Sequence, residues 1–281
     1  MAVHIDSIKQ KLGLLNLFSI LKFRIDFARE HPDFFDADGL VCFCGGQGSG
    51  KTLSAVNYVC KLMDAYPKSI LVTNIMINDY PIVTYEEWKE LNKERFDVLF
   101  SFAHDDDIVN PYMEWEYRKT NRVFPFYDND DLTKYDNDDR GVIFFIDEIQ
   151  LYMNSLESKN INMDVMTQIS QQRKQRKHIV ATSQVFGRMA KPLREQFSDV
   201  IICKCFLRLF QCNKLVNRDD IEDVPTSSTV TGVCKRRFFW FHHPSMYKRY
   251  DTYFVIEKGK FIANENKKGE IYSVDRLSSD S

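Results

Sequence analysis

One stretch of the sequence limits the fold more than any other. The eight residues 45–52, GGQGSGKT, join two apolar segments that differ in their spacing. The residues before them (40–44, LVCFC) form a short apolar run that is typical of a buried strand. The residues after them repeat apolar side chains at helical spacing until Pro67, and another apolar run follows at 69–77. A strand, a glycine-rich turn, a helix and a second strand make a βαβ unit, which predicts a parallel sheet.

The glycine-rich turn has the composition of a phosphate-binding loop. Gly45, Gly50, Lys51 and Thr52 satisfy the pattern G-x-x-x-x-G-K-(S/T), with the required strand before it and helix after it. Glycines let the backbone turn so that successive N–H groups face an anion, and the helix N-terminus adds partial positive charge. We expect Lys51 to reach the β- and γ-phosphates of ATP and Thr52 to ligate Mg²⁺; the alternative is a turn that binds nothing. The predicted binding residues are Gly45, Gly46, Gln47, Gly48, Ser49, Gly50, Lys51 and Thr52.

A pair of acids follows a second apolar run. In GVIFFIDEIQ (141–150), Asp147 and Glu148 come directly after residues that predict a buried strand. The carboxyl ends of parallel strands are where open sheets bind ligands. Asp147 is therefore predicted to complete the Mg²⁺ site, and Glu148 to activate the attacking water. The alternative is an acidic pair that caps a helix.

A third segment, QQRKQRKHIVATSQ (171–184), combines basic and amide side chains. Gln184 ends a predicted strand, where its amide could sense the γ-phosphate. Arg173 belongs to a basic group before that strand, and phosphoryl transfer benefits from an arginine on the developing charge. For Lys174 and Lys177 the alternative is a solvated basic helix end.

Together these segments resemble the FtsK–HerA branch of P-loop ATPases, and within it the Zot-type and viral genome-packaging ATPases. The resemblance rests on the glycine loop, FFIDEIQ and RKQRKHIVATSQ, with SILVTNIMI and MAKPLREQFSDVI in support, and covers roughly 38–210. It implies an α/β fold with a mostly parallel sheet and helices on both faces. Arg173 precedes Gln184 by the spacing at which FtsK-like motors carry an arginine that acts on the neighbouring subunit's nucleotide. The active form would then be a homo-oligomeric ring, most simply a hexamer, with a pentamer as the alternative.

The resemblance implies an ATPase that translocates DNA, as in the packaging of a phage or mobile-element genome. One alternative is a Zot-type ATPase that extrudes filamentous virions, although residues 201–281 lack the membrane-spanning segment of such proteins. Another is a nucleotide-dependent switch without motor activity. A packaging motor would dock on a capsid portal, and an extrusion ATPase on a membrane-bound assembly protein.

Composition separates three segments and limits the class of protein. We expect a helical N-terminal segment (1–37), a P-loop ATPase domain (38–210) and a small β-rich C-terminal appendage (211–281). No run approaches the roughly 18–20 apolar residues of a membrane span, and we expect residues 1–30 not to be a signal peptide, because they have neither a basic start nor a small-residue cleavage site. Seven cysteines are an odd number, which favours reduced thiols in the cytoplasm.

The sequence limits where DNA could bind. The net charge is −2, so a basic surface must be local. One candidate follows the 177–184 strand and another is CKRRFFWFHHPSMYKRY (234–250), for which the alternative is a packing element with a basic outer face. We expect the acidic run 128–139 to be a solvated loop, and we expect no zinc site among the C-terminal cysteines and histidines. The first DNA candidate contains Arg188, Lys191 and Arg194.

Overall fold

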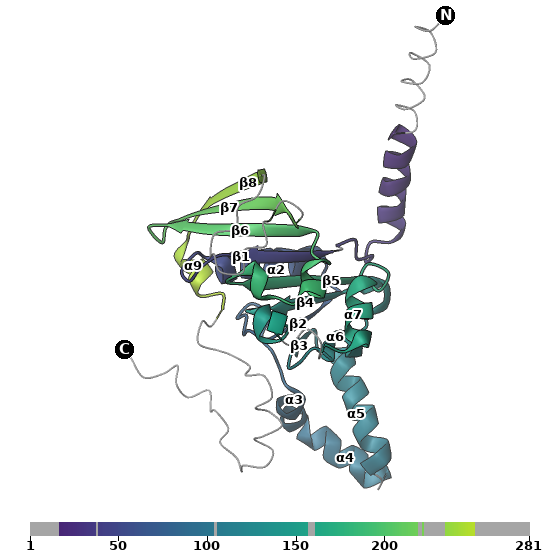
Figure 1. Cartoon of the computed structure of the whole chain (residues 1–281). Helices are drawn as coiled ribbons and strands as arrows, with labels where there is room; N and C mark the ends of the chain where they lie inside the picture. Colours follow the sequence, from purple (N-terminus) through teal and green to yellow (C-terminus); the bar gives the residue numbers. More distant parts are fainter. Residues whose placement is uncertain are drawn as a thin grey trace, which may run out of the picture.

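The computed structural model describes residues 17–37, 39–103, 106–156, 161–218, 221 and 234–250. In this part of the chain, one sheet contains eight strands in the order β3-β2-β4-β5-β1-β6-β7-β8 (Figure 1). The strands from β3 to β6 in this order are parallel, and β7 and β8 are antiparallel to their neighbours. The predicted α/β fold with a mostly parallel sheet is confirmed.

The strands are β1 (Leu40–Cys44), β2 (Ile70–Thr73), β3 (Val123–Pro125), β4 (Val142–Ile146), β5 (Lys177–Ser183), β6 (Asp199–Phe206), β7 (Phe210–Asn217) and β8 (Cys234–Phe241). The α-helices are α2 (Lys51–Ala65), α3 (Tyr85–Leu91), α4 (Lys93–Ala103), α5 (Asp106–Thr120), α6 (Asp131–Lys134), α7 (Met163–Ser170), α8 (Lys191–Arg194) and α9 (Pro244–Tyr247). Three short 3₁₀ helices are η1 (Asp138–Arg140), η2 (Ile149–Leu151) and η4 (Phe186–Arg188). Residues 17–30 form a further helix.

Helices cover both faces of the parallel strands, which explains why β4 is apolar at every position. Successive strand residues point to opposite faces. Phe145 belongs to the same buried cluster as Val56 and Met63 of α2. Phe144 belongs to the cluster on the other face, with Met113 of α5 and Val165 of α7. A strand that is buried on both faces carries a continuous apolar run instead of an alternating one.

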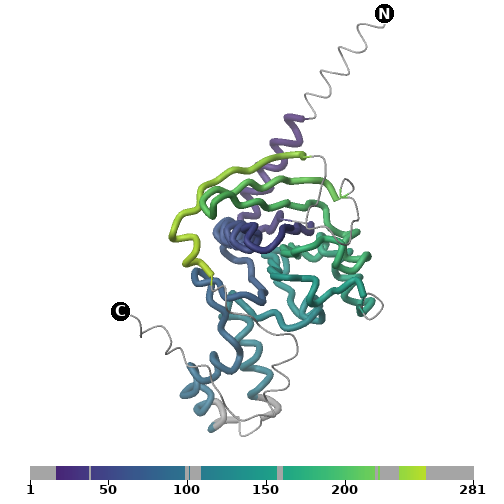
Figure 2. The backbone as a smooth tube through the Cα atoms, turned by 60° about the vertical axis from the view of Figure 1, so that its left-hand side comes forward, coloured from purple at the N-terminus to yellow at the C-terminus, as the bar shows by residue number. Residues whose placement is uncertain are grey.

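Helices α3 to α5 form an arm that projects beyond the sheet (Figures 1 and 2). Helix α3 begins with a capping box in which Thr84 and Glu87 bond to each other's backbone N–H. An ion pair of 2.6 Å between Arg95 and the buried carboxylate of Glu116 joins α4 to α5.

The boundary predicted at residue 210 falls at the start of β7, which follows β6 after a turn. The strands of the predicted appendage, β7 and β8, extend the central sheet through antiparallel pairing. Residues 219–220, 222–233 and 251–281 of that segment lie outside the described residues. So do residues 1–16 of the predicted N-terminal helical segment.

The acidic run 128–139 is more ordered than the expected solvated loop. Asp131, at the start of α6, is 2% exposed. Its carboxylate accepts hydrogen bonds from the backbone N–H groups of Tyr127 (2.7 Å) and Asp128 (3.2 Å), and pairs with Lys134 at 2.8 Å. One aspartate of the run therefore closes a turn, because its Oδ2 atom accepts from two backbone N–H groups while its Oδ1 atom binds Lys134.

We predict that Gly141→Ala destabilises the fold by about 2–4 kcal/mol, from left-handed strain and from overpacking. Gly141 precedes β4 with φ +77°, and a Cβ atom there would lie 2.2–2.6 Å from three atoms of the buried Phe35 side chain. Urea unfolding monitored by circular dichroism measures the change. Gly46→Ala is the matched control, because a Cβ atom at Gly46 meets nothing within 4 Å. Equal free energies of unfolding for the two variants would contradict the packing described.

Candidate active site

The strand order brings the segments that follow β1, β4 and β5 together at one edge of the sheet. Strand β5 lies between β4 and β1, and all three strands are parallel. Ile146 of β4 is level with Ala181 of β5, which is level with Cys42 of β1. The residues that follow these strands therefore start at nearly the same height, at the edge where open α/β sheets bind ligands.

The glycine loop spans from the end of β1 to the start of α2. Gly45 is buried, and its N–H donates to the Ser183 carbonyl oxygen at 3.3 Å, which ties the loop to the end of β5. Gln47 and Gly48 are exposed at the tip. The loop is thus fixed at its base and open at its tip.

The loop is closely packed against Gln211 on one side, at Gly50, and open on the other side, at Gly46 and Gly48. Gly50 has φ +77°, and a Cβ atom there would lie 2.2 Å from Oε1 of Gln211. A Cβ atom at Gly46 or Gly48 would meet nothing within 4 Å, so the outer side is open. The Ser49 hydroxyl is buried and has no hydrogen-bond partner among the described residues.

Asp147 lies beside the first turn of α2. Its Oδ1 atom accepts hydrogen bonds from the hydroxyls of Thr52 (3.1 Å) and Thr182 (2.6 Å). Its backbone N–H and carbonyl both bond to the side-chain amide of Asn74, at 2.8 and 2.9 Å. Burial raises the pKa of Asp147, while the Thr182 hydrogen bond and the charge of Lys51 oppose this shift.

Glu148 faces the lysine of the loop. Its Oε1 atom lies 2.5 Å from Nζ of Lys51 and accepts a hydrogen bond from Gln184 at 3.3 Å, while Gln150 donates to Oε2. The Glu148 backbone is left-handed, with φ +52°, and its N–H donates to the Thr182 hydroxyl at 2.9 Å. A left-handed residue other than glycine costs roughly 1–2 kcal/mol, so the surrounding bonds hold Glu148 in a strained conformation.

These residues fit a nucleoside triphosphate with Mg²⁺. Thr52 and Asp147 offer a hydroxyl and a carboxylate oxygen, which are the hard donors that Mg²⁺ prefers. Lys51 and the first N–H groups of α2 present positive charge beside the open side of the loop. The unpaired Ser49 hydroxyl adds a buried hydrogen-bonding group at the same place.

Arg173 lies apart from this group. It is an exposed residue between α7 and β5, at the opposite end of β5 from Gln184. A strand of 7 residues spans about 23 Å. Lys177, at the start of β5, is not solvated as the alternative proposed. It is 5% exposed and donates to the Leu132 carbonyl (2.8 Å) and to Gln168 (3.1 Å).

Three further residues belong to the group although the sequence predicted no role for them; they are Asn74, Gln150 and Thr182. Asn74 follows β2 just as Asp147 follows β4, and this parallel position could have revealed it. Thr182 and Gln150 carry no such signal, because their roles depend on the strand order and on the turn after β4.

Gln211 of β7 is the fourth residue that the motifs missed. Its fully buried amide donates to the Ser49 carbonyl at 2.9 Å and to Asn213 Oδ1 at 2.7 Å. Its Oε1 atom lies 3.1 Å from Nε2 of His242, just beyond β8. The last two strands of the sheet therefore support the glycine loop through side-chain contacts.

The predicted DNA-facing residues lie between β5 and β6, with Arg188 in η4 and Lys191 and Arg194 in α8. Arg188 and Lys191 are exposed, and Lys191 lies 4.0 Å from Glu195. Arg194 is half-buried in α8.

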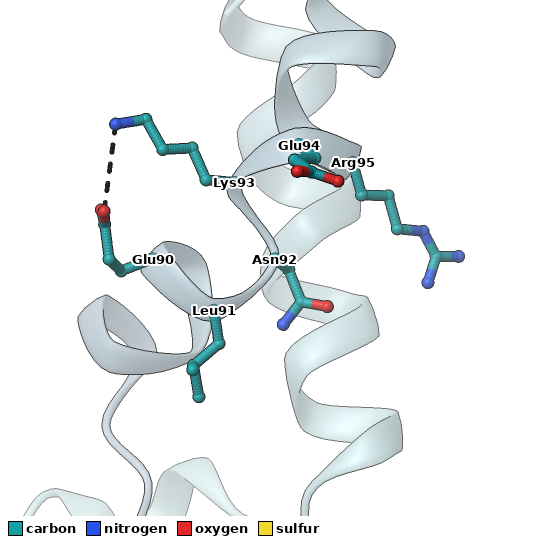
Figure 3. A pocket seen from close by; sticks show the side chains of 6 residues that line it. All are labelled: Glu90, Leu91, Asn92, Lys93, Glu94 and Arg95. Carbon is teal, nitrogen blue, oxygen red and sulfur yellow. Dashed lines mark ion pairs between the residues drawn. The ribbon is translucent and has the colours of Figure 1, made fainter.

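Two other locations do not form comparable sites. Cys205 Sγ lies 3.9 Å from His242 Nε2, but no group of three or more metal-binding side chains occurs within the described ranges. A surface hollow at the junction of α3 and α4 is lined by the six consecutive residues 90–95. Figure 3 shows these side chains fanning outward, with one ion pair of 3.9 Å between Lys93 and Glu90.

No protein-family model matches this sequence, and no curated protein matches it significantly. Among solved structures, the N-terminal domain of zonular occludens toxin from Neisseria meningitidis is similar, with 15% identity and a TM-score of 0.47, over 76% of this chain and 100% of that chain. The genome packaging NTPase of Sulfolobus turreted icosahedral virus 2, in complex with ATP-gammaS, has 11% identity and a TM-score of 0.39, over 58% and 74%.

The DNA-packaging ATPase of Sulfolobus turreted icosahedral virus has 13% identity and a TM-score of 0.40, over 59% of this chain and 76% of that chain. These names belong to the groups that the motifs resemble. Each identity is below 25% and each TM-score is below 0.5, so these similarities assign no activity to this chain. None of the helices in the described ranges has the length and apolarity of a membrane-crossing helix.

We predict that Asp147→Asn raises the free energy of unfolding of the protein without nucleotide by about 1 kcal/mol at neutral pH. Asparagine keeps an acceptor for Thr52 and Thr182 but removes a buried charge. Because the folded-state pKa of Asp147 is raised, its protonated form favours folding at low pH, and this contribution is lost as the pH rises through that pKa. The gain from Asp147→Asn should therefore shrink towards acidic pH.

Chemical denaturation of both proteins from pH 4 to pH 8, in steps of about one unit, measures this difference. Asp164→Asn, an exposed acid of α7, is the control. A variant less stable than the wild type at neutral pH would show that ionised Asp147 stabilises the fold.

Proposed function

We propose that this chain is the ATP-hydrolysing subunit of a motor that moves DNA, as in the packaging of a phage or mobile-element genome. The observation that carries the proposal is the meeting of the glycine loop with the acidic pair. Nζ of Lys51 lies 2.5 Å from Glu148, and the Thr52 hydroxyl lies 3.1 Å from Asp147. A loop that only bound nucleotide would not need a second carboxylate beside its lysine.

In this mechanism the loop N–H groups and Lys51 bind the β- and γ-phosphates of ATP. Thr52 and Asp147 would hold Mg²⁺, which when bound neutralises charge on the phosphate oxygens. Lys51 pairs with Glu148 in this structure, and phosphate oxygens would compete for the same ammonium group. Binding of ATP therefore frees the Glu148 carboxylate to act as a base.

The water oxygen then attacks the γ-phosphorus while the bond to the bridging oxygen breaks, and Glu148 accepts the proton of the water. Gln184 and Gln150 orient the carboxylate, because each donates to one of its oxygens. Gln184 comes directly after β5, so its amide can also respond to the γ-phosphate.

A ring of subunits explains the position of Arg173. Since β5 separates Arg173 from Gln184 by about 23 Å, this arginine cannot reach the ATP bound by its own loop. Head-to-tail contacts between copies close into rings and bring the front of one subunit to the back of the next. We propose a hexamer in which Arg173 completes the neighbouring site.

The remaining partners follow from this activity. A packaging motor contacts the DNA backbone without sequence preference and docks on a capsid portal. The alternative, an extrusion ATPase, would dock on a membrane-bound assembly protein. All seven cysteines are unpaired, which suits the reducing cytoplasm.

We predict that Glu148→Gln lowers the turnover of ATP by about 10²–10⁴-fold and leaves nucleotide binding equal or tighter. Glutamine cannot accept the proton and no longer competes as a charge for Lys51. Phosphate release measures turnover, and a fluorescent ATP analogue measures binding. Glu195→Gln, at an exposed acid that forms the C-cap of α8, should behave as the wild type. Wild-type turnover in Glu148→Gln would exclude the proposed base.

A mixing experiment tests the shared site. Arg173→Ala and Lys51→Ala should each be inactive alone, because one lacks the arginine and the other the loop lysine. In an equal mixture, about a quarter of the interfaces join an intact loop to an intact arginine, so about a quarter of the wild-type turnover should return. Lys174→Ala, the exposed neighbour of Arg173, is the control and should stay active. No recovery on mixing, or full activity of Arg173→Ala, would exclude action between subunits.

A further inference from the structure

Strands β6, β7 and β8 carry an aromatic and basic surface on one face near their β6–β7 turn. In the register, Phe210 is opposite both Phe206 and Phe241, and Lys214 is opposite Arg237. Residues that are opposite each other in a sheet point to the same face. We call this surface the aromatic–basic face; its members are Phe206, Phe210, Phe239, Phe241, Lys204, Lys214 and Arg237.

The rings of this face are exposed and in mutual contact. Phe206, Phe239 and Phe241 are 53%, 57% and 74% exposed. The ring of Phe210 stacks on Phe239 at 5.8 Å and 10°, and lies 5.1 Å from Phe241. A continuous exposed apolar cluster marks an interaction surface, because isolated folding gives no reason to keep it in water.

The charges on the same face are of one sign. Lys204 and Arg237 are exposed, Lys214 is half-buried, and none of the three makes an ion pair with a described residue. Asp199 is the one acid of β6, β7 and β8, and it pairs with Lys235 at 3.1 Å. The face is therefore positive in a chain whose net charge is −2.

We propose that the aromatic–basic face binds single-stranded nucleic acid, with bases stacked on the phenylalanine rings and phosphates on the three cations. Unpaired bases expose flat faces that stack on aromatic rings, whereas a duplex hides them, and cations beside the rings neutralise the backbone. A second copy of this chain fits less well, because a symmetric contact of the face with itself would oppose like charges.

This inference rests on the nucleic-acid part of the proposed function and identifies the surface responsible. Figures 1 and 2 show β8 as the last strand of the sheet, at the edge farthest from β3. The alternate residues of β7 connect that edge to the loop, since Gln211 bonds to the Ser49 carbonyl from the opposite face. Nucleic acid bound to this face would thus lie on the opposite side of β7 from Gln211, which supports the glycine loop.

The test measures binding of the full chain to labelled oligonucleotides without ATP. The probes are oligo-dT, oligo-rU and a duplex of about 20 nucleotides, which is longer than a site of about 4–16 nucleotides. Fluorescence anisotropy over a range of salt concentrations gives affinities and salt slopes. The variants are Phe239→Ala/Phe241→Ala and Lys204→Gln/Arg237→Gln. The controls are Phe23→Ala, an exposed ring of the N-terminal helix, and Lys93→Gln, an exposed lysine of the arm.

We expect the wild type to bind at least one single strand more tightly than the duplex. The aromatic variant should bind about tenfold or more weakly, and the charge variant should lower the salt slope by about 1.4, at 0.7 for each lost cation. Basal ATP turnover should not change in either variant. Phe241→Ala alone, at a highly exposed position, keeps the test valid if the double variant unfolds.

Unchanged affinity in the aromatic variants, or equal affinity for the duplex, overturns the inference. So does a change in oligomeric state without a change in affinity, which would make the face a contact between copies. Failure of the proposed function is distinguishable from failure of this inference. If the wild type binds single strands through this face but does not hydrolyse ATP, the proposed motor is excluded and the binding surface is supported. If the wild type hydrolyses ATP and its aromatic variant binds nucleic acid normally, the binding surface is excluded and the ATPase is supported.

Discussion

The parallel pairing of β5 between β4 and β1 is the constraint on which the site depends. Because Ile146, Ala181 and Cys42 are level, the residue after Ile146 is level with Thr182. The Thr182 hydroxyl can then donate to the Asp147 carboxylate and accept from the Glu148 N–H at once. One hydroxyl in the middle strand thus fixes both acids relative to a loop that begins one strand away. A shift of one residue in the pairing of β5 with β4 or with β1 would turn the Thr182 hydroxyl to the other face of the sheet, away from Asp147 and Glu148.

The same edge is costly for the fold. It contains a buried carboxylate whose pKa is raised by its burial, a left-handed glutamate and an unpaired buried hydroxyl. Each of these features opposes stability, and the apolar strands beneath must offset them. Their concentration within a few residues of Lys51 and Asp147 is the pattern expected where a structure is arranged for a ligand and not for its own stability.

The sequence predicts this site better than it predicts the sheet around it. The loop 45–52 and the pair Asp147–Glu148 are recognisable because their chemistry lies in consecutive residues next to apolar runs. Gln211 and Thr182 are not recognisable, since each acquires its contacts only from a strand order that joins distant segments. The domain boundary predicted at residue 210 falls at the first residue of β7, because no local pattern indicates that β7 pairs with β6.

A composition rich in basic and aromatic residues gives no hint that β7 and β8 pair with the central sheet through β6. The burial of Lys177 likewise depends on the Leu132 carbonyl and on Gln168, which no local pattern connects to it.

Strand β7 contributes residues both to the support of the glycine loop and to the aromatic–basic face. Gln211, on the face that packs against α2, reaches the Ser49 carbonyl and His242, and the next residue on the other side of the pleat, Cys212, lies opposite Phe239. Successive residues of a strand cannot move independently, because the backbone fixes their alternation and the ladder bonds fix their height. Strand β7 and its pairing with β8 therefore fix the aromatic–basic face and the amide that supports the glycine loop on opposite sides of the same ladder.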